Sequence, residues 1–404
     1  MKQCNKTEIL VLGGGYAGTL AVLRLSRNMR RDRVQITLVN ASDHFVERIR
    51  FHQQATNQVV KQYAYTDLLK GTGVNFIKGW VTGLSSDQQM VAVHTARGDT
   101  QVAYDYLVYA LGSKVDIQGI PGASEHAFSL STAETAQALL LQLTKVTAQG
   151  GRLLICGGGL TGIEAATEFA ESYPRLRVTL VTKGVFGDHL SQRGQQHLRH
   201  TFERLNIDVI DQKAVHSIQP DHAICDDEMT IPFDVCVWAG AFTVPTLARH
   251  VGLPVNERGQ IIVDKYLRVK SMPNIYAIGD AATLQEAMPI AIRMACATAA
   301  PMGSYVGNHL AAVIDGRRQQ TPYRFRYFLR CISLGRHDGL VQFVEADDTI
   351  KNRVVTGWLG AKLKELVCRS TIWNMQFERQ LAVLFAGAPQ HYIREVQVAN
   401  QQTT

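Results

Sequence analysis

Apolar residues along the chain form short continuous runs that alternate with longer stretches of helical spacing. The run Glu8–Leu12 (EILVL) leads into the glycine-rich segment GGGYAG, then into a helical stretch at Thr19–Met29 and a second apolar run at Val34–Val39. Short continuous apolar runs are typical of buried strands in a parallel sheet, and the stretch between them predicts a crossover helix. The pattern therefore predicts a βαβ unit.

The same pattern occurs a second time. Arg152–Cys156 (RLLIC) precedes GGGLTG, a helical stretch through Ala170 follows, and the apolar run Arg177–Val181 (RVTLV) completes the unit. A buried strand that ends in a glycine turn comes after each unit, at Tyr104–Ser113 (YDYLVYALGS) and at Phe233–Ala241 (FDVCVWAGA). The chain therefore contains an internal duplication of one strand-helix-strand unit.

The remaining elements are shorter or lie near the C-terminus. Ser131 and Glu134 form the pattern of a capping box, which predicts a helix over Thr132–Thr147. The segment IYAIGDAA predicts a further buried strand that ends in Gly-Asp. From Thr321 onward, strand-like runs (FRYFLRCISL, GLVQFV) precede a final helical stretch at Val354–Phe377.

Glycines follow the first strand at the spacing of a dinucleotide-binding turn. In that motif, the first glycine (Gly13) allows the tight turn, the second (Gly15) admits a pyrophosphate, and the third (Gly18) lets helix and strand pack closely. The positive end of the helix then faces the phosphates. Asn40 stands where an acidic ribose partner is expected, and its amide can still hydrogen-bond a ribose hydroxyl. A structural glycine turn is the alternative for either motif taken alone.

Gly157, Gly159 and Gly162 repeat the motif in the second unit, so the sequence predicts two bound dinucleotides. The second strand of this unit ends in Val-Thr-Lys, without an acid to bind an adenosine 2′-hydroxyl. Lys183 would attract a 2′-phosphate, which favours NADPH over NADH, although a solvated loop lysine is an equal alternative.

Composition and charge narrow the class of protein. The 404 residues suggest two or three domains, and 46% hydrophobic with 19% charged residues is typical of a globular protein. Eleven Lys or Arg against five Asp or Glu between Arg317 and Arg369 account for most of the net charge of +7. The seven cysteines form no C-x-x-C or zinc-ligand spacing, so we expect reduced thiols, no metal, and a cytoplasmic location. No secretory signal or spanning segment is expected, and no nucleic-acid module is recognised.

Together these motifs resemble the FAD-dependent pyridine nucleotide-disulfide oxidoreductase superfamily, nearest to its type II NADH dehydrogenase and apoptosis-inducing-factor-like branches. The resemblance covers about residues 7 to 320 and rests on GGGYAG, YDYLVYALGS, GGGLTGIEAA, FDVCVWAGA and IYAIGDAA in that order. It implies an α/β fold with two Rossmann-like dinucleotide-binding domains, for FAD and NAD(P), and a smaller C-terminal α+β region. The expected domains are 1–118 and 246–320 for FAD, 119–245 for NAD(P)H, and 321–404 at the C-terminus.

The resemblance also implies roles for single residues. Asp280 would hydrogen-bond the ribityl chain of the flavin, Val81 would meet the adenine through its backbone, and Glu164 would lie near the nicotinamide carboxamide as the candidate catalytic residue. A helix N-cap is the alternative for Asp280, and an exposed helix carboxylate is the alternative for Glu164. The remaining cofactor-binding candidates within the motifs are Tyr16, Ala17, Ala110, Gly112, Gly240 and Gly279.

The sequence also departs from the family pattern. It lacks the redox pair C-x-x-x-x-C after the first unit, which excludes a flavin-to-disulfide relay; Arg48, Arg50 and His52 lie there instead. An arginine such as Arg48 beside a flavin would stabilise the anionic reduced form, and the alternative is that these residues lie on the surface. The quinone-site pattern A-Q-x-A-x-Q is replaced by AIRMACAT, which puts quinone in doubt as the acceptor. Cys156 and Cys331 are expected to be small buried residues rather than a relay.

The final helical stretch, 354–377, predicts a basic amphipathic helix. Its expected apolar face carries Leu359, Leu363, Leu366, Ile372 and Trp373. Peripheral membrane contact is one interpretation, and packing against the core or a second copy of the chain is the other.

The predicted reaction is hydride transfer from NADPH or NADH to FAD, followed by electron transfer to a small quinone-like acceptor. Two alternatives stay open: reduction of a carrier protein such as a ferredoxin, or slow-turnover sensing of NAD(P)H. The acceptor itself and the oligomeric state are not determined by the sequence.

Overall fold

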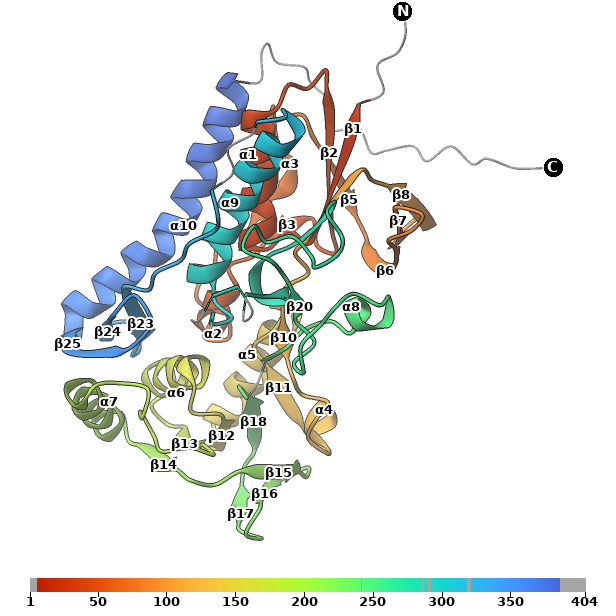
Figure 1. Cartoon of the computed structure of the whole chain (residues 1–404). Helices are drawn as coiled ribbons and strands as arrows, with labels where there is room; N and C mark the ends of the chain where they lie inside the picture. The colour runs from red at the N-terminus through yellow and green to blue at the C-terminus, as the bar shows by residue number, and fades with distance from the viewer. Residues whose placement is uncertain (1–5, 241, 285–286, 289–291, 318–320, 386–404) are drawn as a thin grey trace, which may run out of the picture.

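The computed structural model describes residues 6–240, 242–284, 287–288, 292–317 and 321–385. Figure 1 shows two lobes, each built around a twisted sheet, and one long helix, α10, along the outside of the first lobe. The predicted pair of Rossmann-like sheets is confirmed, because both sheets are parallel and each follows a strand-helix-strand unit.

The first sheet has the strand order β21-β9-β1-β2-β5, and all its neighbours are parallel. Its strands are β1 (Thr7–Leu12), β2 (Val34–Asn40), β5 (Val74–Lys78), β9 (Tyr106–Tyr109) and β21 (Ile275–Ala277). Helix α1 (Tyr16–Asn28) connects β1 to β2, and α9 (Cys296–Ile314) packs against α1. The late strand β21 thus returns to the sheet that the N-terminal strands begin.

The second sheet has the order β11-β18-β12-β13-β14 and is also parallel. Its strands are β11 (Ala127–Ser129), β12 (Arg152–Cys156), β13 (Arg177–Val181), β14 (Ile207–Ile210) and β18 (Val235–Trp238). Its helices are α5 (Ala133–Thr147), α6 (Leu160–Ser172) and α7 (Gln192–Arg204). In each sheet the closing strand (β9 or β18) lies next to the first strand (β1 or β12), and the second (β2 or β13) and third (β5 or β14) strands follow. The two sheets therefore share one strand order, in agreement with the internal duplication of the sequence.

Smaller elements surround the two sheets. Three antiparallel three-stranded sheets are β6-β7-β8 (Trp80–Ser85, Met90–Thr95, Gly98–Ala103), β15-β16-β17 (Val215–Ile218, His222–Cys225, Thr230–Pro232) and β23-β24-β25 (Leu329–Ser333, Gly339–Val344, Ile350–Thr356). Two-stranded pairs are β3-β4 (His44–Phe45, Tyr63–Ala64), β10-β19 (Lys114–Val115, Phe242–Thr243) and β20-β22 (Ile261–Ile262, Ala282–Thr283). The short helices are α2 (Phe51–Gln54), α3 (Tyr65–Leu68), α4 (Ala123–His126) and α8 (Leu247–His250), with 3₁₀ turns at Arg48–Arg50 and Gly279–Ala281.

The cap of α5 lies one residue later than predicted. The hydroxyl of Thr132 accepts a hydrogen bond from the backbone N–H of Thr135 at 3.2 Å, and the Thr135 hydroxyl accepts one from the N–H of Thr132. Ser131 and Glu134 are therefore not the capping pair. The reciprocal geometry of the box is retained with threonine in place of the acid.

The last helix begins at Gly357 and not at Val354. Residues 354–356 belong to β25, where Val354, Val355 and Thr356 pair with β24. These residues are β-branched and favour a strand, and Gly357 with φ +68° turns the chain into α10 (Gly357–Phe385). The predicted range 354–377 therefore joins the end of a strand to most of a helix.

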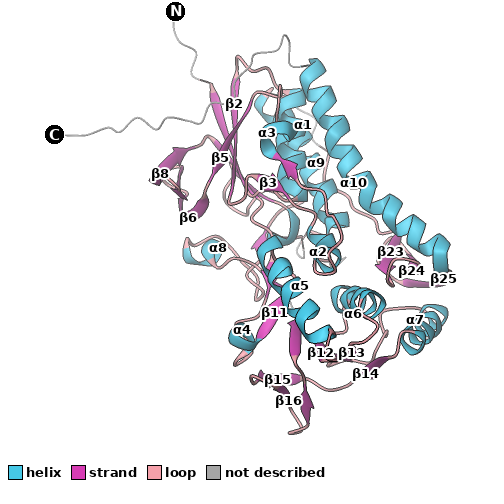
Figure 2. Ribbon diagram, turned by 180° about the vertical axis from the view of Figure 1, so that it is seen from behind, coloured by secondary structure: helices cyan, strands magenta, loops and turns pink. Residues whose placement is uncertain are grey.

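The apolar stripe predicted for this helical stretch lies mostly on the exposed side of α10. Its buried positions include Cys368, Ile372 and Met375, and Glu378 forms ion pairs with Arg24 at 2.8 Å and Arg27 at 3.2 Å on α1. Of the five residues of the predicted apolar face, only Ile372 is buried; Leu359, Leu366 and Trp373 are exposed and Leu363 is half-buried. Figure 2 shows α1, α9 and α10 side by side along the first sheet.

Candidate functional site

The first glycine turn lies between β1 and α1. A Cβ atom on Gly13, whose φ is +98°, would lie 2.7 Å from the carbonyl carbon of Ala110, and a Cβ on Gly18 would overlap the carbonyl oxygen of Gly13. Both positions therefore require glycine for packing alone. A Cβ on Gly15 would meet no atom within 4 Å, because Gly15 borders open space at the N-terminus of α1. This is the place where the motif admits a pyrophosphate.

Two of the predicted cofactor residues have clear roles in holding the backbone. The side-chain oxygen of Asn40 accepts a hydrogen bond from the N–H of Gly14 at 2.9 Å, and its amide nitrogen donates to the carbonyl of Ser42. Asn40 therefore fixes the glycine turn, and contact with a ribose stays a prediction. Val81 pairs with Val93 in the β6-β7 ladder, and its contact with adenine likewise stays a prediction.

Asp280 lies in the 3₁₀ turn after β21 and has one unused buried oxygen. Its Oδ2 accepts a hydrogen bond from the Ser113 hydroxyl at 2.6 Å, whereas its Oδ1 has no hydrogen-bond partner among the described residues. Burial raises the pKa of Asp280, and the Ser113 hydroxyl, the Arg48 charge and the backbone N–H of Ala295 oppose that shift. Because buried polar atoms are almost always hydrogen-bonded, the free oxygen fits a donor from a bound ligand, such as a ribityl hydroxyl. The N-cap alternative is wrong, since the cap of this turn is Ile278.

The arginines after the first unit, Arg48 and Arg50, are both partly buried. Arg48 donates to the carbonyl of Ser113 at 2.7 Å, and burial lowers its pKa while Asp280 and Tyr16 oppose that shift. The Arg50 side chain is only 12% exposed and forms ion pairs with Glu47 and Glu365, each at 3.0 Å. The surface alternative is therefore wrong for Arg50. Arg48 brings positive charge to the same region as Asp280.

The second glycine turn repeats the first. Gly157 has φ +128°, and a Cβ there would lie 2.8 Å from the carbonyl carbon of Ala239; a Cβ on Gly162 would overlap the carbonyl oxygen of Gly157. A Cβ on Gly159, at the N-terminus of α6, would meet nothing within 4 Å. A Cβ on Gly240 would lie 2.7 Å from the ring of Trp238. Each glycine turn thus has one glycine whose open side is not filled by protein.

The other motif residues surround these turns. Tyr16 and Ala17 open α1, Gly112 follows β9 with φ +70°, and Gly279 follows β21 with φ +69°. Lys183 lies two residues after β13 and is exposed.

Glu164 on α6 is buried, so the exposed-carboxylate alternative is wrong. Its Oε1 lies 2.8 Å from the Nζ of Lys364 on α10 and accepts a hydrogen bond from the backbone N–H of Ser333 at 3.0 Å. Burial alone would raise the pKa of Glu164, but the attraction of Lys364 and the hydrogen bond from Ser333 lower it below the usual value. The same pairing raises the pKa of Lys364 against the opposing effect of burial. The pair is charged at neutral pH.

Lys364 is mostly buried, although its neighbours in the sequence, Lys362 and Glu365, are typical of a polar helix face. Its side chain is 17% exposed and lies near Cys296, Cys331 and Cys368. Burial raises the pKa of Cys296 to about 11 and that of Cys331 to about 12, so both thiols are protonated at neutral pH. Cys156 and Cys331 are both free of disulfides.

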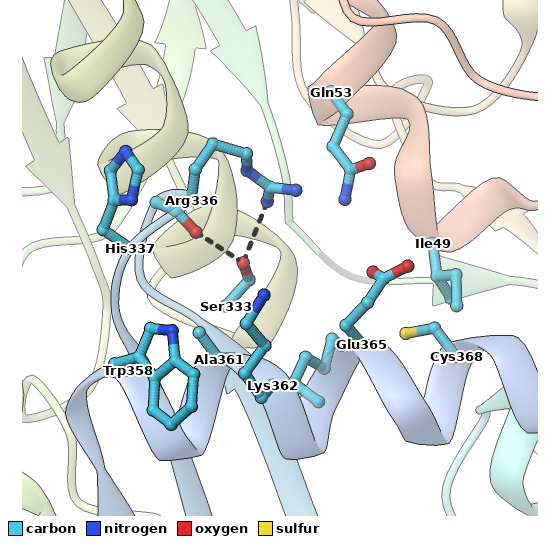
Figure 3. Close-up of a pocket in the computed structure, with 12 residues that line it drawn as sticks. Ile49, Gln53, Ser333, Arg336, His337, Trp358, Ala361, Lys362, Glu365 and Cys368 are labelled. Carbon is cyan, nitrogen blue, oxygen red and sulfur yellow. Dashed lines mark hydrogen bonds between the residues drawn. The ribbon is translucent and has the colours of Figure 1, made fainter.

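A cavity of about 290 Å³ lies beside the Glu164–Lys364 pair, between α10, α2 and the turn after β23. Figure 3 shows side chains from the three elements converging on this space, with Arg336 of the turn and Gln53 of α2 both facing α10. It is lined by Ile49, Gln53, Ser333, Gly335, Arg336, His337, Trp358, Ala361, Lys362, Lys364, Glu365 and Cys368. Sequence reasoning missed this cavity because its walls come from segments far apart in the chain.

The chain is similar to known oxidoreductases over most of its length. A family model described as pyridine nucleotide-disulphide oxidoreductase matches residues 7–298. The demethylphylloquinone reductase NdbB of Synechocystis sp. is 27% identical over 350 residues, which cover 83% of this chain and 86% of that protein. A type II NADH:quinone oxidoreductase of Staphylococcus haemolyticus is 26% identical and covers 92% of this chain and 96% of its own.

Two solved structures share the fold. The sulfide:quinone oxidoreductase of Aquifex aeolicus aligns with a TM-score of 0.79 at 20% identity, over 95% of this chain and 96% of that one. The NDH2 of Plasmodium falciparum, solved with NADH, aligns with a TM-score of 0.80 at 15% identity, over 94% and 98%. These likenesses extend through the C-terminal segment that the family model does not cover.

Proposed function

The chain belongs to the pyridine nucleotide-disulphide oxidoreductase family, and we propose that it is an FAD-dependent enzyme that oxidises NAD(P)H and reduces a quinone-like small molecule. The observation that carries the proposal is the pair of glycine turns. Each follows the first strand of a parallel sheet, and in each the second glycine borders open space at a helix N-terminus. A protein with two such turns is suited to hold two dinucleotides at once.

The first lobe would hold the flavin, which when bound accepts a hydride and passes its electrons on. Gly15 and the N-terminus of α1 would receive the pyrophosphate, which favours FAD over a mononucleotide. The free Oδ1 of Asp280 would accept a hydrogen bond from the ribityl chain. Arg48 would supply positive charge next to that carboxylate.

The second lobe would hold the nicotinamide cofactor. Gly159 and the N-terminus of α6 would receive its pyrophosphate, and Glu164 lies one turn further along the same helix. Lys364 and the N–H of Ser333 hold the Glu164 carboxylate in one orientation. Glu164 is therefore the candidate to orient the carboxamide, with Lys364 as a positioning residue.

NADPH is the proposed preference over NADH. Lys183 is exposed directly beyond β13, where NAD-selective folds of this type carry an acid. No arginine lies in the loop TKGVFGDH, so the preference would be modest.

The acceptor would be a small quinone-like molecule. Two of the relatives named above are quinone reductases, and their alignments with this chain cover 86% and 96% of their own lengths. The cavity beside Glu164 and Lys364 offers a space of the size of a small ring system.

We further propose that the outer face of α10 contacts a membrane surface. Leu359, Leu366, Trp373, Phe377 and Leu384 are all exposed, and their spacing sets them along one side of the helix, opposite its buried face. Lys362 and Arg369 flank this stripe. None of the helices in the described part of the chain is long and apolar enough to cross a membrane.

An acceptor screen tests the proposed reaction. Flavin-loaded protein supplied with NADPH or NADH would be offered neutral quinones, a ferredoxin or oxygen, and the oxidation of the nucleotide would be followed by its absorbance. Turnover with quinones well above that with the other acceptors supports the proposal. Turnover with ferredoxin alone, or none with any acceptor, would overturn it in favour of a carrier-protein reductase or an NAD(P)H sensor.

A further inference from the structure

The cavity beside the Glu164–Lys364 pair carries more positive than negative charge. Arg336, Lys362 and Lys364 line it against one acid, Glu365. That acid is already engaged, because Glu365 forms ion pairs with Arg50 at 3.0 Å and Arg369 at 2.7 Å. Lys364 is paired with Glu164 and Arg336 with Glu168, so Lys362 is the cation of this lining that forms no ion pair with a described residue.

Lys362 is the least engaged of these cations. It is exposed, it forms no ion pair with a described residue, and its Nζ lies 5.8 Å from the ring centre of Trp358. The Trp358 side chain is itself exposed and lines the same cavity. The rim thus offers an ammonium group and an aromatic ring next to each other.

Arg336 contributes a second, more fixed cation from the turn after β23. Its Nη2 lies 2.6 Å from Glu168 and donates to the Ser333 hydroxyl at 3.0 Å, which holds the guanidinium in place. Its Nε is buried and has no hydrogen-bond partner among the described residues. Figure 3 shows the guanidinium reaching over the cavity from the side opposite α10.

We propose that this cavity selects acceptors that carry an acidic group, so that an anionic ring quinone is preferred over its neutral counterpart. The inference rests on the proposed quinone reductase activity and deepens it. The ring would lie against Trp358, and its carboxylate or sulfonate would lie between Lys362 and Arg336. A volume of about 290 Å³ accommodates one or two fused rings and leaves a long apolar tail outside.

The test compares two quinones that differ mainly by an acidic group, 1,2-naphthoquinone-4-sulfonate and 1,2-naphthoquinone. Full-length, flavin-loaded protein with saturating NAD(P)H gives kcat/KM for each at low and high KCl. The ratio of the two values is expected to favour the sulfonate at low salt and to fall as salt screens the cations. In Lys362→Met the ratio at low salt should fall roughly twofold to fivefold. It should fall further in Lys362→Glu, whereas Lys362→Arg, which keeps the charge, should have the wild-type ratio. Lys145→Met, at an exposed lysine of α5, is the matched control and should keep the wild-type ratio.

A binding measurement separates this inference from the proposed activity. Naphthalene-2-sulfonate is not a quinone, and it should quench tryptophan fluorescence in the wild type, less in Lys362→Met and not in Trp358→Phe. If neither quinone is reduced but this binding occurs, the activity is wrong and the anion site stands. If both quinones are reduced with a ratio that neither salt nor Lys362→Met changes, or if the quench is absent, the anion preference is overturned while the activity stands.

Discussion

Lys364 on α10 lies 2.8 Å from Glu164 on α6, and this buried ion pair connects the C-terminal helix to the helix that begins at the second glycine turn. The two residues are far apart in sequence, and each is the other's main source of charge compensation. We therefore expect the pair to contribute to stability and to fix the orientation of the Glu164 carboxylate.

Replacing Lys364 by Met should destabilise the protein by about 3–5 kcal/mol, because Glu164 would be left as an uncompensated buried carboxylate. The double variant Lys364→Met with Glu164→Gln should recover most of that loss. Urea unfolding followed by circular dichroism measures both changes. Lys362→Met, two residues away on the exposed face, is the control and should stay within about 0.5 kcal/mol of the wild type. Equal stability of Lys364→Met and the wild type would mean that the pair is not buried in solution.

His52 should make the protein less stable as the pH falls. Burial lowers the pKa of His52 to about 4, whereas an unfolded histidine titrates at 6.5. Between these values the unfolded chain binds a proton and the folded chain does not, so stability is present above 6.5 and is lost as the pH falls towards 4. The full difference of 2.5 units corresponds to about 3 kcal/mol.

The variant His52→Leu tests this pH dependence. Unfolding free energies measured from pH 7.5 to 5 should fall less steeply in the variant than in the wild type. Parallel curves for the two proteins would mean that His52 is not buried as a neutral ring. Carboxylates that titrate in the same range contribute equally to both curves and cancel in the comparison.

Replacing Asp280 by Ala should lower the fraction of protein that retains flavin. The variant loses a charge-assisted hydrogen bond of about 1.5–3 kcal/mol to the ligand and leaves the Ser113 hydroxyl without its acceptor. Asp280→Asn keeps an acceptor oxygen and should retain more flavin than Asp280→Ala. The ratio of flavin to protein absorbance, measured after dilution and gel filtration, reports occupancy. Occupancy equal to that of the wild type in Asp280→Ala would rule out the assignment of Asp280 to the flavin.

Replacing Lys183 by Ala should reduce the preference for NADPH. A single exposed lysine beside a 2′-phosphate is expected to give roughly a threefold to tenfold preference, and high salt should reduce it. Stopped-flow reduction of the flavin by NADPH and by NADH measures this ratio in the wild type, in Lys183→Ala, and in Lys70→Ala as an exposed control. If NADH is at least as efficient as NADPH in the wild type and Lys183→Ala changes neither rate, Lys183 has no role in nucleotide choice.

The strands and turns next to the glycine motifs could be predicted from sequence because their signals are local. β12 (Arg152–Cys156) and β13 (Arg177–Val181) have the predicted bounds, since each is a run of apolar residues bounded by a turn. The boundary between β25 and α10 was misplaced although Val354, Val355, Thr356 and Gly357 contain a strand-then-turn signal.

The candidate site was less accessible to sequence reasoning, because its key contacts join distant segments. The hydrogen bond from Ser113 to Asp280 and the ion pair of Lys364 with Glu164 have no counterpart in local spacing. Lys364 lies next to Lys362 and Glu365 in the sequence, and this pattern also fits a solvent-exposed helix face. Only the contact with Glu164 on α6 shows that Lys364 points inward. The sequence also left two interpretations of the apolar stripe of α10 open, and only the structure shows that the stripe richest in Leu and Trp is exposed.

Binding of a separate dinucleotide in each lobe can be tested with valine at Gly15 and Gly159, the glycines of the two turns that border open space. A Cβ at Gly15 or Gly159 meets no protein atom within 4 Å, so either variant should fold, while the branched side chain occupies the path of a pyrophosphate. Gly159→Val should keep its flavin, resist bleaching by NADPH and NADH, and still be bleached by dithionite and reoxidised by a quinone. Gly15→Val should lack flavin. Flavin absorbance followed by anaerobic stopped flow gives the result: loss of reduction by NAD(P)H in Gly159→Val with the flavin retained supports the account, and reduction at the wild-type rate would contradict it.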